Sequence, residues 1–453
     1  MKDNKLGIMP ISKLIWNMSL PIIASMLVQA LYNIVDSVFV SQVSEQALTA
    51  VTLAFPAQNL MIAVASGTGV GVNALLSRSL GEKNYDQANK AANNSILLAL
   101  IGFAAFCLFG IFGSRPFFAM QTDNTEIVEY GVQYMTIVCG LSVGLFLQIT
   151  LERLLQSTGR TFYTMITQGT GAILNIIFDP ILIFGYFGAP ALGIAGAAGA
   201  TVFGQIIAFG LGFYLNKTKN HEITISLRSF KPNGEIIRHI YAVGVPSIIM
   251  ASIGSIMTFG INKILIAFSS TATAVFGVYF KLQSFVFMPV FGLNNGTVPI
   301  IAYNYGAGKP DRIMGTIKLA AVYATTIMLC GFAVFQLMPD KLLMIFSASD
   351  TMLSIGIPAL RIISISFLFA GCSIVCTSLF QALGHGMLSL WISVFRQLVV
   401  LLPVAFIFAR IGGLHTVWFA FPIAEAFAII FSGVCLVHVY RKEIIPLKAQ
   451  QGK

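Results

Sequence analysis

Residues 81–86 read Gly-Glu-Lys-Asn-Tyr-Asp, and residues 306–311 read Gly-Ala-Gly-Lys-Pro-Asp. Each hexapeptide separates two long apolar segments, and the first copy begins at Gly81 and the second at Gly306. The offset between these two positions, called the repeat offset below, pairs further identical residues along the chain: Pro21 with Pro246, Gly67 with Gly292, Gly71 with Gly296, Gln156 with Gln381 and Gly159 with Gly384. So many identities at a single offset indicate that one structural unit occurs twice in this chain.

The composition indicates a protein that folds in lipid. Of the 453 residues, 57% are hydrophobic and 10% are charged, whereas soluble domains average about 25% charged residues. Apolar runs long enough to cross a bilayer, about 20 residues each, recur along the whole chain. These runs predict an all-α polytopic membrane protein with twelve transmembrane helices, at residues 14–40, 49–78, 92–114, 129–153, 162–187, 191–216, 239–268, 272–304, 313–338, 351–382, 387–410 and 414–439.

The net charge of +10 follows the predicted topology. Most Lys and Arg residues fall in the N-terminal segment, in alternate loops and in the C-terminal tail, whereas the opposite side of the membrane holds Arg115, Lys341 and Arg410. Loops rich in Lys and Arg stay in the cytoplasm, so both termini are expected there. The basic balance therefore gives no reason to expect a nucleic-acid partner.

Six spans in each copy bring the chain back to the side on which that copy began, so the copies are parallel repeats. We expect an N-terminal six-helix lobe at residues 1–216, a cytoplasmic linker at 217–235, a C-terminal six-helix lobe at 236–440 and a cytoplasmic tail at 441–453. Channels, receptors and membrane enzymes also contain repeats, but two parallel helical lobes favour transport by alternating access.

Two aspartates in the first copy are candidate functional residues, because an ionisable side chain inside a membrane is costly. Asp36 and Asp179 both fall near the outer ends of their predicted spans. Asn175 precedes Asp179 by four residues and so shares its helix face. Pro180 cannot donate to the helical ladder, which frees a backbone carbonyl. Two small residues lie at a similar depth on the next span: Ala197 and Thr201.

Together these groups predict a cation-coupling site. Carboxylates held close together in a low dielectric favour a bound proton, and oxygen ligands suit a hard cation. The coupling ion is expected to be H⁺ or Na⁺, the latter held by Asp36, Asn175, Asp179 and Thr201. The alternative is that these polar groups only hydrogen-bond neighbouring helices.

The second copy does not repeat the carboxylates. At the repeat offset, Ile261 and Val404 stand in the places of Asp36 and Asp179. Its spans carry other ionisable residues instead: Lys281, Arg396 and Glu425. We expect a polar network in which the glutamate pairs with one of the two basic residues, with a structural role favoured over substrate contact.

Two further sets of residues have weaker signals. Pro21 lies inside the first span, where a proline can kink the helix and give it two shapes. We expect Pro21 and Pro180 to act as a conformational switch, a static kink being the alternative. Flexible apolar side chains of the second copy are candidates for an adaptable substrate cavity, with core or lipid contact as the alternative: Met257, Phe280 and Met288.

Five segments give the chain a resemblance, over nearly its full length, to the multidrug and toxic compound extrusion (MATE) family and to its MepA-type bacterial branch. They are SLPIIASMLVQALYNIVDSVFV (19–40), GVNALLSRSLGEKNYDQA (71–88), LNIIFDPILIFG (174–185), FKPNGEIIRHIYAVGVPS (230–247) and GTVPIIAYNYGAGKPDR (296–312). The resemblance implies a V-shaped, two-lobe MATE fold that exports organic cations in exchange for inward H⁺ or Na⁺.

The resemblance also implies roles for particular residues. The family's cation site falls on Asp36, Asn175, Asp179, Ala197 (through its carbonyl) and Thr201, and its bending proline falls on Pro21. The NorM-type branch has acidic residues in spans seven and ten, where this sequence has none, so no second sodium site is expected. The chain is expected to be a monomer in the bacterial cytoplasmic membrane, with no enzymatic activity and no cofactor beyond the coupling ion.

Two other functions were weighed against multidrug export. A flippase for lipid-linked oligosaccharides or lipids would need a cationic cavity, to which Lys281 and Arg396 could contribute, but the acidic residues of the first copy argue against it. An intramembrane aspartyl protease would use Asp36 and Asp179 as a catalytic dyad. Neither aspartate stands in the Gly-x-Gly-Asp context of such enzymes.

Overall fold

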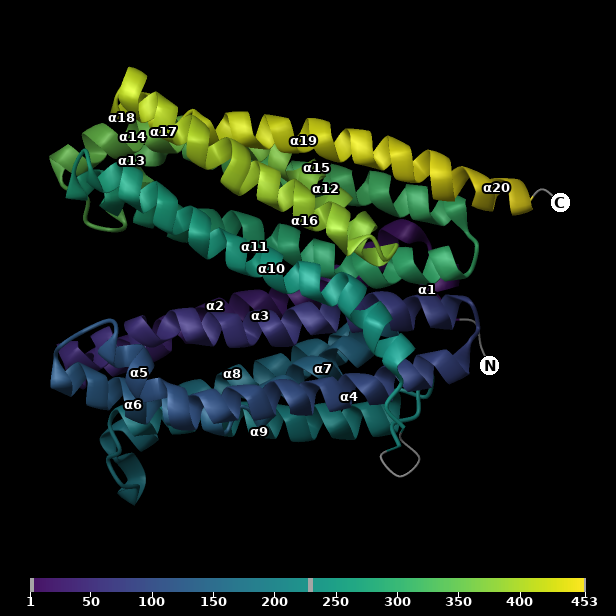
Figure 1. Cartoon of the computed structure of the whole chain (residues 1–453), viewed down its shortest axis with the longest axis horizontal. Helices are drawn as coiled ribbons and strands as arrows, with labels where there is room; N and C mark the ends of the chain where they lie inside the picture. Colours follow the sequence, from purple (N-terminus) through teal and green to yellow (C-terminus); the bar gives the residue numbers. More distant parts are fainter. Residues whose placement is uncertain (1–3, 227–230, 452–453) are drawn as a thin grey trace. The chain divides into compact units, whose positions relative to one another are not determined.

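The computed structural model describes residues 4–226 and 231–451 (Figure 1). Residues 1–3 of the predicted first lobe, 227–230 of the predicted linker and 452–453 of the predicted tail lie outside the described residues. Within the described ranges the ordered elements are all helical. Ten helices are long and apolar enough to cross a membrane, and counting two bent helix pairs as one span each gives up to twelve. This agrees with the predicted all-α fold and its twelve spans.

Contacts divide the chain into two compact units. Unit 2 comprises Ala24–Gly244 and unit 1 comprises Met1–Ile23 with Val245–Lys453. The division differs from the lobe boundaries expected from the repeat. Two long helices pass from one unit to the other: α2 (Ile11–Ser41) just after Pro21, and α10 (Gly234–Ile266) just before Pro246.

Unit 2 contains these further helices: α3 (Glu45–Gly81), α4 (Tyr85–Leu108), η1 (Phe109–Gly113), α5 (Ser114–Ala119), α6 (Thr125–Gly140), α7 (Val143–Ser157), α8 (Thr161–Phe184), η2 (Tyr186–Gly188) and α9 (Ile194–Lys219). Unit 1 contains α1 (Lys5–Ile8), α11 (Ser270–Gly306), α12 (Pro310–Leu337), α13 (Pro339–Met344), α14 (Asp350–Ser364), α15 (Phe367–Ala382), α16 (Gly386–Val394), η3 (Phe395–Leu401), α17 (Leu402–Ile411), α18 (Leu414–Val417), α19 (Ala420–Val439), η4 (Tyr440–Ile444) and α20 (Ile445–Gln451).

The helix ends follow the repeat. Ser44 and Ser269, which match at the repeat offset, cap α3 and α11, each hydroxyl accepting a hydrogen bond from a backbone N–H three residues later at 3.0 Å. Such caps satisfy donors that the first helical turn leaves open. The bent pairs also match, since α6 and α7 meet at 44° and α14 and α15 at 47°. The duplicated sequence therefore encodes duplicated local structure.

Close contacts of small residues hold the first halves of α2 and α10 in their units. In unit 1, a Cβ added to Gly296 of α11 would lie 2.4 Å from the Ser19 hydroxyl oxygen of α2. In unit 2, a Cβ added to Gly71 of α3 would lie 2.0 Å from the Ile240 carbonyl oxygen of α10. Gly71 and Gly296 are a matched pair of the repeat, so the two units use the same contact.

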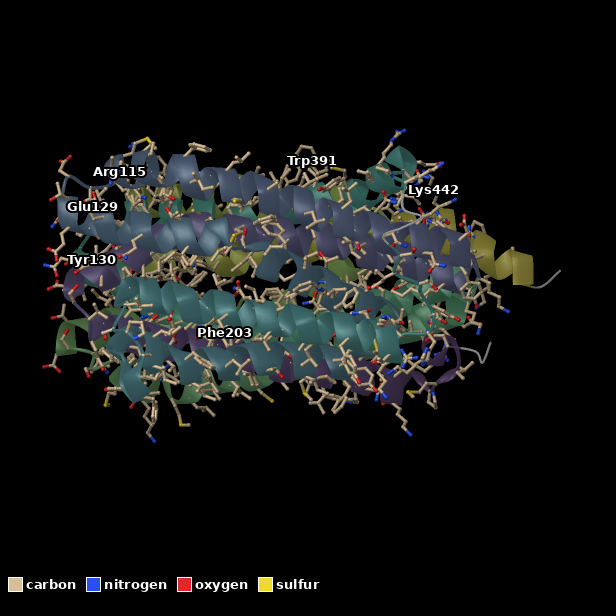
Figure 2. All side chains as sticks on the ribbon, turned by 90° about the horizontal axis from the view of Figure 1, so that it is seen from below. Arg115, Glu129, Tyr130, Phe203, Trp391 and Lys442 are labelled. Carbon is tan, nitrogen blue, oxygen red and sulfur yellow. The ribbon has the colours of Figure 1, made fainter. Side chains whose placement is uncertain are left out.

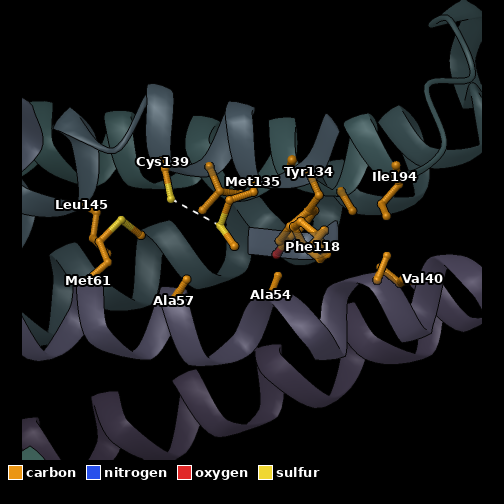
Figure 3. Close-up of a cluster of buried hydrophobic side chains, with 14 of the residues drawn as sticks. Val40, Ala54, Ala57, Met61, Phe118, Tyr134, Met135, Cys139, Leu145 and Ile194 are labelled. Carbon is orange, nitrogen blue, oxygen red and sulfur yellow. Dashed lines mark hydrogen bonds between the residues drawn. The ribbon is translucent and has the colours of Figure 1, made fainter. Parts of the chain in front are cut away.

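Charged residues in unit 2 lie mainly at the ends of its helices. Arg115 of α5 and Glu129 of α6, both labelled in Figure 2, form an exposed ion pair at 2.8 Å. Between the helix ends much of the core is apolar. Figure 3 shows one cluster of buried side chains there, in which the Cys139 and Met135 sulfur atoms lie 3.4 Å apart. This distribution is the one that a helical unit in lipid needs.

Candidate cation-coupling site

The site in unit 2 begins with the close approach of α8 and α9. Small residues recur at every fourth position of α9: Gly196, Ala200, Gly204, Ala208 and Gly212. A Cβ added to Gly204 would lie 2.6 Å from the Gly171 carbonyl oxygen of α8, so the two backbones pack almost directly on each other. Such stripes allow close helix packing in membranes. The approach brings short side chains of the two helices within hydrogen-bonding distance.

Asn175 of α8 connects Asp179 to Thr201 of α9. With the amide orientation assigned from its hydrogen bonds, Asn175 Nδ2 donates to Asp179 Oδ2 at 2.9 Å, and Asn175 Oδ1 accepts from Thr201 Oγ1 at 3.1 Å. The Thr201 backbone N–H also lies 3.0 Å from Asn175 Oδ1. The regular helical acceptor of that N–H is the carbonyl of Ala197. Asp179 and Ala197 are fully buried.

Asp36 of α2 completes the carboxyl pair, because its side chain lies within reach of a hydrogen bond with that of Asp179. Two carboxyl groups can form such a bond only if one of them carries a proton. Oδ1 of each aspartate is buried and receives no hydrogen bond from an N–H or hydroxyl group of the described residues. The pair therefore has free acceptor capacity for a proton or a small cation.

Three more polar residues of unit 2 lie near the pair and were not predicted from the sequence. Tyr32 and Tyr134 are both neighbours of the two aspartates. Gln58 Nε2 donates to the Tyr134 hydroxyl at 3.0 Å. Tyr32 could have been found, since it precedes Asp36 by one helical turn. Gln58 and Tyr134 lie on other helices, so no spacing in the sequence relates them to either aspartate.

Apolar residues follow the two aspartates on α2 and α8. Val40 and Ile183 lie four residues after Asp36 and Asp179, and each is at most 2% exposed. Both belong to the cluster in Figure 3, where Val40 and Tyr134 are labelled. Apolar residues therefore lie on one side of the carboxyl groups and the polar groups of Asn175 and Thr201 on the other.

The donor set suits a proton or a hard cation better than a transition metal. No group of three or more His, Cys, Asp or Glu residues that could hold a metal ion occurs among the residues that the structure describes. The available ligands are oxygen atoms, namely two carboxyls, an amide, a hydroxyl and a helical carbonyl, which is the ligand type that hard cations prefer. Of the predicted residues, Asn175, Asp179 and Thr201 are joined by hydrogen bonds in unit 2, Asp36 lies beside Asp179, and Ala197 lies one turn before Thr201 on α9. Their role in cation coupling stays a prediction.

The polar residues of unit 1 are arranged differently. Arg396 Nη1 lies 3.1 Å from Glu425 Oε1, so the glutamate pairs with Arg396 rather than with Lys281. The Lys281 ammonium lies 5.9 Å from the centre of the Phe346 ring. Glu425 Oε2 is buried and has no hydrogen-bond partner among the described residues.

The remaining predicted residues lie in long helices. Pro21 is inside α2 and Pro180 inside α8, and both helices continue through the proline. The three predicted cavity residues stand on α10 and α11, where Met257 and Met288 are half-buried and Phe280 is 42% exposed. Their roles as switch and cavity residues stay predictions.

Duplicated membrane-spanning helices, with a buried carboxyl pair in one unit and none at the matching positions of the other, define a polytopic membrane transporter. The MatE family profile matches residues 21–181 and 246–407, and the two matches begin at the paired prolines, so one falls on each repeat. The chain belongs to the MatE family. Members of this family are transporters and not enzymes.

Curated relatives align with nearly the whole chain. Multidrug export protein MepA of Staphylococcus aureus is 27% identical over 454 residues, covering 98% of this chain and 98% of the relative. A protein of Shewanella oneidensis named FAD transporter is 27% identical over 443 residues, covering 97% of this chain and 96% of the relative.

Solved structures match over a similar length. A multidrug resistance MATE family transporter of the MOP superfamily, in an outward-facing conformation, has a TM-score of 0.91 at 27% identity, covering 99% of both chains. A MOP superfamily transporter from Pyrococcus furiosus has a TM-score of 0.90 at 26% identity, also covering 99% of both chains. The fold and family predicted from the sequence are confirmed.

Proposed function

We propose that this protein exports small organic cations by exchanging them for protons at the Asp36–Asp179 pair. The proposal depends on one observation: the Asp36 and Asp179 side chains lie within reach of a hydrogen bond with each other, and such a bond can form only when the pair holds a proton. Loss of that proton leaves two negative charges in contact within a low dielectric, which is unfavourable unless the pair separates or binds a cation. Protonation is thereby coupled to the positions of α2 and α8.

The proton would drive transport by alternating access. In the outward-facing state, protonation of the pair joins Asp36 on α2 to Asp179 on α8, and Pro21 gives α2 a position at which to bend. The bent helix releases the substrate outward, and the proton leaves to the cytoplasm after the units have rearranged. A bound proton shifts the equilibrium between two conformations only if it binds one of them more tightly. The conformation in which the two carboxyl groups are in contact would bind it more tightly.

The substrate class rests on relatives. MepA of S. aureus is named for multidrug export, which supports small organic molecules as substrates. The FAD transporter of S. oneidensis aligns over a similar length at the same identity, so a flavin dinucleotide is a second candidate substrate. We place the protein in the bacterial cytoplasmic membrane as a monomer with both termini in the cytoplasm, because the basic residues favour that orientation.

Transport into sealed proteoliposomes tests the proposal. Purified protein would take up ethidium when driven by a pH gradient, whereas a sodium gradient at constant pH would drive none. Asp179→Asn should reduce proton-driven transport to the level of protein-free liposomes, because an amide cannot release a proton. Asp123→Asn, at an exposed residue between α5 and α6, is the matched control and should transport like the wild type.

Two results would contradict the proposal. Sodium-driven transport that ignores the pH gradient would replace the proton with Na⁺ at the same oxygen ligands. Full activity of Asp179→Asn would remove the carboxyl pair from the mechanism altogether. The same uptake experiment with FAD in place of ethidium decides between the two substrate candidates.

A further inference from the structure

Unit 2 contains a second buried carboxyl group, distant from the aspartate pair. Glu152 of α7 is 3% exposed. Its Oε1 accepts a hydrogen bond from Gln148 Nε2 at 3.0 Å. Thr167 Oγ1 of α8 lies 3.2 Å from the same oxygen and shares its proton with the Thr164 carbonyl at 2.8 Å. Gln168 of α8 is a further polar neighbour. The Glu152 carboxyl is thus held by neutral donors, which can accommodate it in its charged or its protonated form.

One charged group acts on this carboxyl. Arg153, the next residue on α7, is the ionisable residue that interacts electrostatically with Glu152. Adjacent residues of a helix do not face each other, and Arg153 Nη1 donates to Gln156 at 2.9 Å.

The repeat shows that packing does not require this carboxyl. Thr377 of α15 is the residue that matches Glu152 at the repeat offset, and Ser389 matches Thr164 in the same way. Ser389 Oγ donates to the Thr377 carbonyl at 3.1 Å, just as Thr164 Oγ1 donates to the Glu152 carbonyl at 3.4 Å. The helix contact is therefore made in both units. Of the matched residues Glu152 and Thr377, only Glu152 carries a carboxyl group.

A separate group of buried polar side chains lies at the ends of α3 and α7, of which Ser157 is five residues after Glu152 on α7. Ser157 Oγ donates to Asn73 Oδ1 at 2.9 Å, and Ser77 Oγ donates to the Ser157 carbonyl at 3.0 Å. All three residues are at most 1% exposed. The positions of unit 1 that match Asn73 and Ser77 are apolar: Val298 and Ala302. Unit 2 thus has polar groups towards the helix ends where unit 1 has apolar ones.

We propose that Glu152 is a second proton-binding site, which receives the coupling proton from the Asp36–Asp179 pair and releases it towards the cytoplasm. The inference rests on the proposed function and its orientation. Thr167 and Asp179 are twelve residues apart on α8, or roughly 18 Å, so water molecules carry the proton between the two sites. The Glu152 carboxylate accepts the proton, becomes a neutral acid, and returns it to water at the inner ends of α3 and α7.

Two transport measurements on Glu152→Gln test this role. The substitution keeps the size of the side chain and removes its proton. Ethidium–ethidium exchange at equal pH, which needs no net proton movement, should stay within twofold of the wild type. Uptake driven by a pH gradient should fall by at least about 100-fold, the usual size of a lost proton-transfer group. Glu129→Gln, an exposed carboxylate of the same unit, should leave both rates unchanged.

Each outcome bears on the proposal. If Glu152→Gln keeps wild-type uptake under a pH gradient, Glu152 is only a packing residue and the proposal is wrong. Equal loss of exchange and driven uptake in a variant that unfolds like the wild type would also overturn it, because the defect would then lie in substrate handling. If the wild type itself shows no proton-driven uptake, the proposed function has failed first.

A second variant covers the case in which Glu152→Gln does not fold. Thr167→Val keeps the carboxyl and removes one of its hydrogen-bond donors. The pH midpoint of driven uptake should then shift by about half a unit to one unit, while equal-pH exchange is retained. An unchanged midpoint in a folded Thr167→Val protein would exclude Glu152 from the proton route.

Discussion

The α8–α9 pair of unit 2 and the η3–α19 pair of unit 1 occupy matching places in the two repeats but are held together by different interactions. In unit 2, α8 and α9 meet through small residues, with Gly171 packed on Gly204. In unit 1, Arg396 stands at the position of Gly171, and its partner Glu425 stands at that of Ala200. An ion pair thus replaces a contact of backbone on backbone, and η3, a π-helical segment, forms at Arg396.

The difference shows what a close helix contact contributes to the site. Around α8 and α9, the short distance lets Asn175 bridge Asp179 and Thr201. The matching residues of unit 1 are apolar: Val400, Val404 and Ala426. Since unit 1 has no carboxyl pair to position, its helices tolerate longer side chains between them. Packing and chemistry have diverged together in the two repeats.

Breaking the ion pair should have the largest effect on stability. Arg396→Ala leaves the Glu425 carboxylate half-buried without its cation, which should cost about 3–5 kcal/mol. Thermal unfolding of the purified protein measures the loss. The double variant Arg396→Met/Glu425→Met removes both charges and should be close to the wild type. An equally destabilised double variant would show that the charges themselves are needed.

Separating α8 from α9 should have an intermediate effect on stability. Gly204→Ala places a methyl group 2.6 Å from the Gly171 carbonyl oxygen, so α8 and α9 must separate. We expect a loss of about 1–3 kcal/mol in thermal unfolding, together with weaker proton-driven uptake. Gly210→Ala is the control on the same helix, because no atom lies within 4 Å of its new methyl group. Equal stability of the two variants would argue against the close contact.

Removing one hydroxyl from the site should have the smallest effect. Thr201→Val keeps the shape of the side chain and loses the hydrogen bond to Asn175 at 3.1 Å, which should cost about 1 kcal/mol. Proton-driven uptake should fall about fivefold, and Thr201→Ser should restore it. If Ser and Val behave alike, the hydroxyl has no part in positioning Asn175.

Most of the fold was predictable because membrane spans are long and apolar. The sequence did not predict that the first half of α2 belongs to unit 1 and the first half of α10 to unit 2. The contacts of Gly71 and Gly296 that hold these halves join segments far apart in sequence. In the site, Asp36 and Asp179 stood out as charges in apolar spans. Tyr134 did not stand out, because placing a tyrosine in a membrane span costs far less free energy than placing a charge there. Glu152 lies near the end of a predicted span, where a charge appears ordinary until its burial is known.

The exchanged halves of α2 and α10 also bear on biosynthesis. Ser19 and Ile23 of α2 pack on glycines of α11, and the rest of their unit starts at Val245. At roughly 5–20 residues per second, a ribosome needs tens of seconds to reach these partners. During that time the first helix waits in the membrane with its partner residues not yet made. A cut between the repeats would divide both units, so the two halves are expected to mature only as one uninterrupted polypeptide.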